Sequence, residues 1–124
     1  MSWDTDLAEA AKSWADHLAA TGRFEHSPDE LQAVPAGENL WMGTAGYYKP
    51  ENMVGRWIAE KQHFKPGVFP DNSRTGDVQD VGHYTQVIWR QTVRVGCALA
   101  KNREDEYLVC RYKKAGNVIG QAPV

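Results

Sequence analysis

Apolar residues recur at steps of three and four positions along the first part of the chain, from Asp4 to Ala20. Six residues carry this pattern: Leu7, Ala10, Ala11, Trp14, Ala15 and Leu18. Because such spacing places side chains on one stripe of a helix, the sequence predicts an amphipathic helix here. Gly22 follows directly and suits the C-terminal cap of that helix.

A second helix is predicted from Pro50 to about Phe64. Proline is tolerated in the first turn of a helix, which places Pro50 at its start. The apolar stripe of this helix consists of Met53, Val54, Trp57 and Ile58. Glu60 comes three residues after Trp57 and four before Phe64. Its carboxylate is therefore expected beside the apolar face rather than opposite it.

Segments 27–37 and 65–80 are rich in proline, glycine and other turn-forming residues, which predicts loops. A loop as long as the second one is usually functional or mobile in a small domain, and the sequence does not decide between the two. The secondary structure of segment 82–89 stays undecided. The positions of Tyr84, Val87 and Ile88 fit a short helix about as well as the alternation of apolar and polar residues fits a strand.

The last third of the chain predicts a β-hairpin, with strands Val93–Lys101 and Glu106–Tyr112 joined by a turn at Asn102–Asp105. Symmetric pairing about the turn sets four opposed pairs on one face: Lys101 with Glu106, Leu99 with Leu108, Cys97 with Cys110, and Val95 with Tyr112. In this register opposite charges meet and apolar residues meet apolar residues.

The same register predicts a disulfide between Cys97 and Cys110. Directly opposed residues of antiparallel strands have Cα atoms roughly 4.5–5.5 Å apart, which a disulfide can span. The alternative is a pair of reduced core cysteines that only pack against each other.

Composition narrows the class of protein. The chain has 124 residues, 42% apolar and 24% charged, as in ordinary globular domains. Its net charge of −2 and the absence of a lysine or arginine stripe argue against nucleic acid as a partner. No run of roughly 18 apolar residues could cross a bilayer. The first residues lack the basic and apolar pattern of a signal peptide, so the chain as given is expected to be soluble and leaderless.

Three residues in the middle of the chain are candidates for chemistry. His26 stands where the chain leaves the first helix, and His83 opens the undecided segment. Glu38 enters an apolar, aromatic stretch, and a carboxylate buried there must be paired or protonated. Their spacing matches no compact metal motif. His17 and His63 are interpreted as a surface residue and a structural residue.

Several segments resemble the motifs of the CAP superfamily, which comprises cysteine-rich secretory, antigen 5 and pathogenesis-related proteins. Segment 82–89 (GHYTQVIW) resembles the first signature of that family. Segment 107–112 (YLVCRY), followed by Gly116 and Asn117, resembles the second. Segments 37–40 and 57–60 and His26 match further family positions. The resemblance covers nearly the whole chain.

This resemblance implies one domain over residues 1–124, with an α+β fold: a three-layer α-β-α sandwich around a mainly antiparallel sheet. It places a cleft tetrad at His26, Glu38, Glu60 and His83, with His26 and His83 as ligands of a divalent metal such as zinc. Two imidazoles form an incomplete ligand shell, so we expect weak and pH-dependent binding. The family also implies an extracellular protein, which agrees with a disulfide.

One departure from the family concerns the start of the chain. Family domains usually carry a further helix before the Trp-Asp-x-x-Leu motif, which here stands at Trp3 to Leu7. The sequence is therefore interpreted either as a trimmed piece or as a short form. In a short form the uncovered apolar surface would be filled by a neighbouring chain, so we expect self-association to a homo-oligomer.

Three functions stay open at this point. The first is a binding module for a metal or for a small apolar ligand, such as a sterol or fatty acid. The second is a zinc-dependent hydrolase in which Glu38 or Glu60 acts as general base. The third is an extracellular interaction or defence protein whose tetrad is a purely structural hydrogen-bond network.

Overall fold

The structure is a computed structural model that describes residues 1–28 and 36–124. Its helices are α1 (Thr5–Thr21), α2 (Pro50–Ala59) and α3 (Gly82–Ile88), with short 3₁₀ helices η2 (Glu60–His63) and η3 (Val78–Asp80). Its strands are β1 (Ser2–Trp3), β2 (Gly37–Thr44), β3 (Arg94–Lys101) and β4 (Asp105–Lys113). The α+β class is therefore confirmed.

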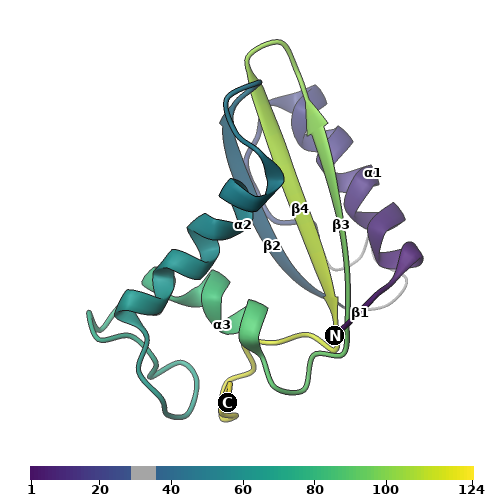
Figure 1. Ribbon diagram of the computed structural model, residues 1–124. Helices are drawn as coiled ribbons and strands as arrows, with labels where there is room; N and C mark the ends of the chain where they lie inside the picture. The colour runs from purple at the N-terminus through teal and green to yellow at the C-terminus, as the bar shows by residue number, and fades with distance from the viewer. Residues whose placement is uncertain (29–35) are drawn as a thin grey trace.

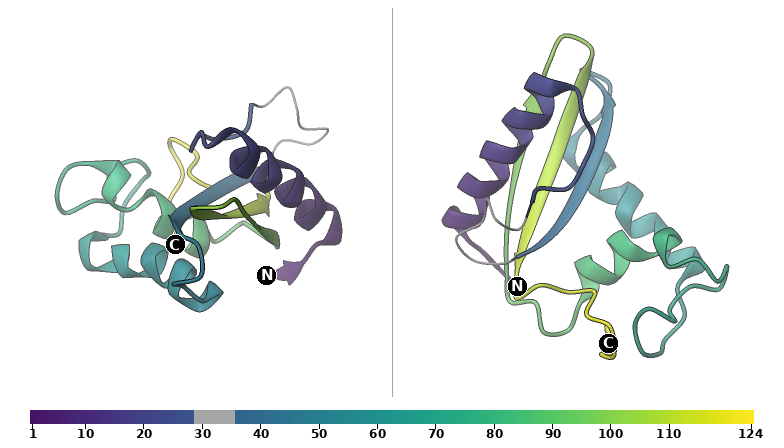
Figure 2. Two further views of the ribbon diagram at one scale, coloured as in Figure 1. Left: turned by 90° about the horizontal axis from the view of Figure 1, so that it is seen from above. Right: turned by 180° about the vertical axis from the view of Figure 1, so that it is seen from behind.

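A four-stranded sheet forms the middle layer, in the order β1-β3-β4-β2. Strands β3, β4 and β2 are antiparallel, whereas the short β1 runs parallel to β3. The sheet is thus mixed but mainly antiparallel, as predicted. Helix α1 covers one face, and α2 and α3 lie on the other side of the sheet (Figures 1 and 2).

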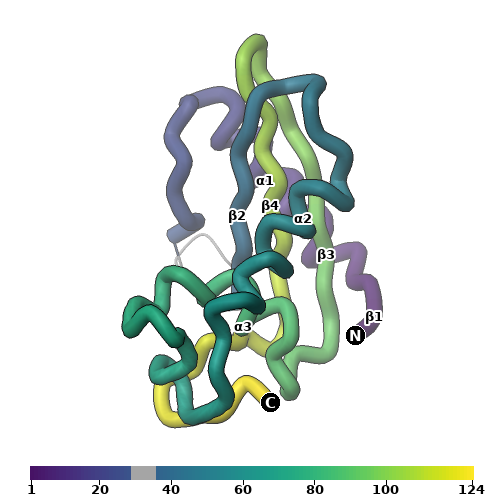
Figure 3. The backbone as a smooth tube through the Cα atoms, turned by 60° about the vertical axis from the view of Figure 1, so that its left-hand side comes forward, coloured from purple at the N-terminus to yellow at the C-terminus, as the bar shows by residue number. Residues whose placement is uncertain are grey.

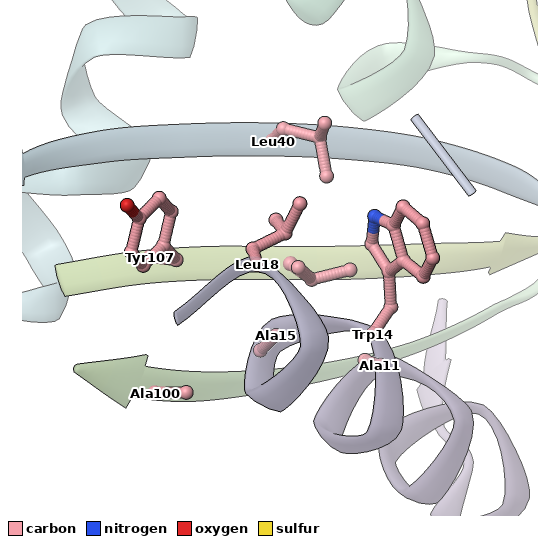
Figure 4. Close-up of a cluster of buried hydrophobic side chains, with 8 residues drawn as sticks. Ala11, Trp14, Ala15, Leu18, Leu40, Ala100 and Tyr107 are labelled. Carbon is pink, nitrogen blue, oxygen red and sulfur yellow. The ribbon is translucent and has the colours of Figure 1, made fainter. Parts of the chain in front are cut away.

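Helix α1 is defined by its two ends and its apolar stripe. The side chain of Asp4 accepts a 3.0 Å hydrogen bond from the amide of Leu7, which caps the N-terminus. Gly22 takes the left-handed conformation, with φ of 70°, and donates its amide to the oxygen of Leu18. Four of the six predicted stripe residues are buried against the sheet, whereas Ala10 is exposed. Together with residues of β2, β3 and β4 they form a core (Figure 4), which consists of Ala11, Trp14, Ala15, Leu18, Leu40, Ala100, Tyr107 and Val109.

Close contact between α1 and β3 depends on Gly96. A Cβ atom built at this position would lie 2.2 Å from the amide nitrogen of Ala8. No side chain fits such a gap, so glycine lets the helix backbone approach the strand directly.

A second core lies between the sheet and α2. Its buried members are Trp41, Met53, Trp57, Leu108, Cys110 and Tyr112. Successive strand residues point to opposite faces, which is why Leu40 belongs to the first core and Trp41 to the second. The indole nitrogen of Trp57 donates a 3.1 Å hydrogen bond to the oxygen of Leu40 and thereby fixes α2 on β2.

The predicted hairpin is confirmed in its register. Strands β3 and β4 pair Lys101 with Glu106, Leu99 with Leu108, Cys97 with Cys110 and Val95 with Tyr112. The Cys97–Cys110 disulfide is also confirmed, with a Cα–Cα distance of 4.1 Å. Neither cysteine is free. The turn is closed by the side chain of Asn102, which accepts hydrogen bonds from the amides of Glu104 and Asp105.

Two local predictions need correction. The second helix does not continue as one α-helix to Phe64, because it changes to the 3₁₀ helix η2 at Glu60. The carboxylate of Glu60 bonds the first turn of α3, and this tertiary contact coincides with the change. The first loop ends before Gly37, which already belongs to β2; its residues 29–35 lie outside the described part of the chain. The structure also answers a question that the sequence left open: segment 82–89 forms a helix over Gly82–Ile88.

Within the described residues, no helix combines the length and apolar character that crossing a membrane requires.

Candidate functional site: two histidine–glutamate pairs

His26 and Glu38 form the first pair. The Nδ1 atom of His26 lies 2.9 Å from Oε1 of Glu38, which extends from the start of β2. Glu38 also accepts two hydrogen bonds from Ser27, one from the backbone amide at 2.9 Å and one from the side-chain hydroxyl at 2.5 Å. The carboxylate side chain is buried, with 7% of its surface exposed, while the imidazole of His26 is 66% exposed. A buried carboxylate thus orients an exposed imidazole.

Arg111 supports this pair from the neighbouring strand. It lies opposite Glu38 in the register of β2 and β4, and its guanidinium Nη1 donates to Oε2 of Glu38 at 3.3 Å. The same nitrogen donates to the hydroxyl of Ser27 at 3.0 Å. Burial acts to raise the pKa of Glu38, but hydrogen bonds from His26 and Ser27 and the charge of Arg111 outweigh it, so this pKa is lowered.

The sequence interpretation missed Arg111, although a signal was present. Cys110 and Tyr112 face α2 in the predicted hairpin. Alternation then places Arg111 on the opposite face of a strand that is central in the sheet. A charged side chain at such a position requires a charged partner.

Glu60, from η2, and His83, from α3, form the second pair. The Nδ1 atom of His83 lies 2.8 Å from Oε2 of Glu60. Oε1 of Glu60 accepts a 2.9 Å hydrogen bond from the amide of Tyr84, so the carboxylate also caps the start of α3. The imidazole stacks on the buried ring of Trp57, with 5.9 Å between centroids and 7° between planes. His83 is thus held on two sides.

Asn39 connects the two pairs. Its side-chain amide donates to the backbone oxygen of His83 at 3.1 Å and to the hydroxyl of Tyr112 at 3.2 Å. Burial raises the pKa of Tyr112 to about 12, against the opposing effect of the hydrogen bond with Asn39. Within residues 1–28 and 36–124, no direct hydrogen bond joins one pair to the other. The connection runs through Glu38 and Asn39, which are consecutive in β2.

The two imidazoles present the chemistry that a metal ligand needs. In both pairs Nδ1 contacts a carboxylate, which favours the tautomer with its proton on Nδ1 and leaves the lone pair on Nε2. In the described part of the chain, no three His, Cys, Asp or Glu side chains are grouped to hold a metal ion. The donor set therefore fits at most a partial ligand shell of two imidazoles, completed by water or a ligand.

A separate cavity lies beside α1 and the hairpin. Its lining consists of Lys12, Asp16, Leu99, Ala100, Lys101 and Glu106. None of the four tetrad residues contributes to it, and its two lysines and two carboxylates suit charged ligands rather than apolar ones.

Residues 1–112 match the family model of the cysteine-rich secretory protein family (CAP). The chain belongs to the CAP family. It is 38% identical over 124 residues to pathogenesis-related protein 1B of Nicotiana tabacum, covering 99% of this chain and 68% of that protein. It is also 35% identical to pathogenesis-related protein 1 of Arabidopsis thaliana, covering 99% of this chain and 70% of the relative.

Solved structures show the same fold. The crystal structure of NaASP2 with Zn²⁺ superposes with a TM-score of 0.80 at 26% identity, covering 98% of this chain. The structure of BmVAL-1 superposes with a TM-score of 0.77 at 24% identity. The chain spans 63% of the NaASP2 chain and 62% of the BmVAL-1 chain. Together, the family and the pathogenesis-related relatives support an extracellular, defence-type protein.

Proposed function

We propose that this protein is an extracellular binding protein that holds a divalent metal ion, such as Zn²⁺, weakly through His26 and His83. The observation that carries the proposal is that both imidazoles contact a glutamate through Nδ1, at 2.9 Å and 2.8 Å. Histidines that ligate metals commonly donate their second ring nitrogen to a carboxylate, which fixes the tautomer and raises ligand basicity.

Two further observations support this proposal. The two pairs are tied together through Glu38 and Asn39 of β2, which restricts how far they move relative to each other. The similar protein NaASP2 has a crystal structure with Zn²⁺. Because the described side chains supply two imidazoles and no third grouped ligand, we expect low affinity.

Self-association is a second candidate property, favoured by exposed apolar residues at one edge of the sheet. Met1, Trp3 and Val93 are 62%, 57% and 51% exposed. They lie close together, because the amide of Ser2 bonds the oxygen of Val93. Burying such residues against a second copy would remove apolar surface from water. Light scattering at increasing concentration tests this, and a Trp3→Glu variant should shift any dimer towards the monomer.

Calorimetric titration with ZnCl₂ tests the metal proposal. We expect His26→Ala and His83→Ala each to lose most of the binding, because either change leaves a single imidazole. His17→Ala is the matched control, since His17 is exposed and stacks on Trp14 outside both pairs. Unchanged affinity in either pair variant would remove that histidine from the site. Unfolding of both variants, without zinc binding by the wild type, would favour a purely structural tetrad.

A further inference from the structure

Helix α3, which carries His83, depends on contacts from outside for its position. It has seven residues, and among the described residues its N-terminus has no capping side chain at the N-cap position. A helix this short gains little from its own hydrogen bonds. Instead, Glu60 bonds the amide of Tyr84, and Asn39 bonds the oxygen of His83. Three further hydrogen bonds come from the C-terminal tail.

The tail after β4 passes beside α3, as Figure 3 shows. Asn117 adopts φ of 54°, in the left-handed region. From this position its Nδ2 atom donates to the oxygen of Gly82 at 2.9 Å, and its Oδ1 accepts from the hydroxyl of Thr85 at 2.6 Å. The amide of Gly116 donates to Oε1 of Gln86 at 2.9 Å. Asn117 therefore holds the first turn of α3 at the residue before His83.

We propose that Asn117 is a positioning residue for His83, which sets the first turn of α3 so that the imidazole meets Glu60 and presents Nε2 to a ligand. As far as it concerns metal binding, this inference rests on the proposed function. Its structural part, the alignment of Tyr84 and His83 with Glu60, holds without any metal.

This role is specific to the second pair. His26 and Glu38 depend on Ser27 and Arg111, and the described hydrogen bonds of Asn117 reach neither residue. A change at Asn117 should therefore affect one half of the site and leave the other half unchanged. The first pair serves as an internal reference, which separates positioning from general loss of stability.

The variant Asn117→Gly removes the side chain without straining the backbone, because glycine readily adopts positive φ. The tail keeps other anchors: Phe69 exchanges backbone hydrogen bonds with Gly120 and Gln121, and Arg90 bonds Pro123. We therefore expect the variant to fold with its tail in place. Thr85→Val is a second variant of similar shape, which removes the bond to Asn117 from the helix side together with the bond of the same hydroxyl to the oxygen of Gly82. Gln121→Ala, an exposed tail substitution, is the control.

The first measurement uses the metal-free protein and two amide protons that each bond one glutamate, those of Tyr84 and Ser27. We expect the NMR chemical shift of the Tyr84 amide to move upfield in Asn117→Gly and Thr85→Val, as its bond to Glu60 lengthens. The Ser27 amide should keep its position in both variants. Gln121→Ala should change neither signal. An unchanged Tyr84 signal in both variants would overturn the proposal, as would equal shifts of both amides.

The second measurement is titration with ZnCl₂. Changes that disturb the partners of metal ligands typically weaken affinity about 10-fold to 100-fold, so we expect at least about 10-fold weaker binding in Asn117→Gly. Wild-type affinity in that variant would overturn the role of Asn117 in metal binding. If the wild type binds no zinc, the proposed function fails while the amide shifts still decide whether Asn117 positions His83.

Discussion

The side chain of Asn39 donates a 3.1 Å hydrogen bond to the backbone oxygen of His83, across the interface between β2 and α3. The carboxylate of its neighbour Glu38 contacts the imidazole of His26 at 2.9 Å. Consecutive strand residues point to opposite faces, so one dipeptide reaches both histidines. The alternation of a single strand thus joins two pairs that no direct hydrogen bond connects within the described residues.

Replacement of Asn39 by leucine should destabilise the protein. Asn39 is 2% exposed, and its loss leaves the oxygen of His83 and the hydroxyl of Tyr112 without this donor. Unsatisfied buried groups typically cost about 1–3 kcal/mol of unfolding free energy each. Urea denaturation measures the effect, with Met42→Leu, an exposed site in the same strand, as control. Equal stability of Asn39→Leu and the control would contradict the connecting role of Asn39.

Replacement of Arg111 by methionine should be more severe. Arg111 is 3% exposed and bonds the buried carboxylate of Glu38, so the change leaves a buried charge without its charged partner. Removing one member of a buried ion pair costs about 3–5 kcal/mol. The double variant Arg111→Met/Glu38→Gln should recover part of that loss in urea denaturation. A double variant no more stable than Arg111→Met would mean that Arg111 acts mainly through contacts other than Glu38.

The stability of the protein should fall at acid pH in a way that depends on Glu38. Its pKa in the folded protein is lowered below the ordinary value of 4.5. The unfolded chain therefore takes up this proton first as the pH falls. The stabilisation from Glu38 is complete above pH 4.5 and is lost as the pH falls through the lower folded-state pKa.

Urea midpoints measured from neutral pH to about pH 3 test this dependence. Glu38→Gln should be less stable than wild type at neutral pH and should lose less stability on acidification. Glu51→Gln, an exposed glutamate in the first turn of α2, is the control and should follow the wild type. Parallel pH curves for Glu38→Gln and the wild type would contradict the lowered pKa.

Removal of the disulfide should destabilise the hairpin and the core around it. Cys97 and Cys110 are separated by 13 positions, and closing a loop of this size stabilises by about 3 kcal/mol through restriction of the unfolded chain. The variant Cys97→Ala/Cys110→Ala should show this loss and should not respond to reducing agent. Thiol titration of the denatured, unreduced wild type should find no free thiol; two reactive thiols would refute the bridge.

The sequence alone determined the elements whose information is local. Apolar residues spaced three and four positions apart, followed by Gly22, were enough to predict α1. A short turn between two complementary strands was enough to predict the register and the disulfide of the hairpin. In both cases the interacting positions are near in the chain, so periodicity and symmetry about a turn leave few alternatives. The grouping of the two histidines and two glutamates into one site came from the resemblance to known motifs, because their spacing in the sequence does not indicate it.

Only the tertiary structure decided how these residues are paired. Segment 82–88 is helical because Glu60, Asn39 and Asn117, from three distant parts of the chain, bond its first turn. The pairing of Arg111 with Glu38 likewise joins two different strands. Such contacts form between residues 23 to 73 positions apart. The pattern of polar and apolar residues in a short segment does not reveal these distant contacts. The packing of the sheet and helices therefore decides which residues pair.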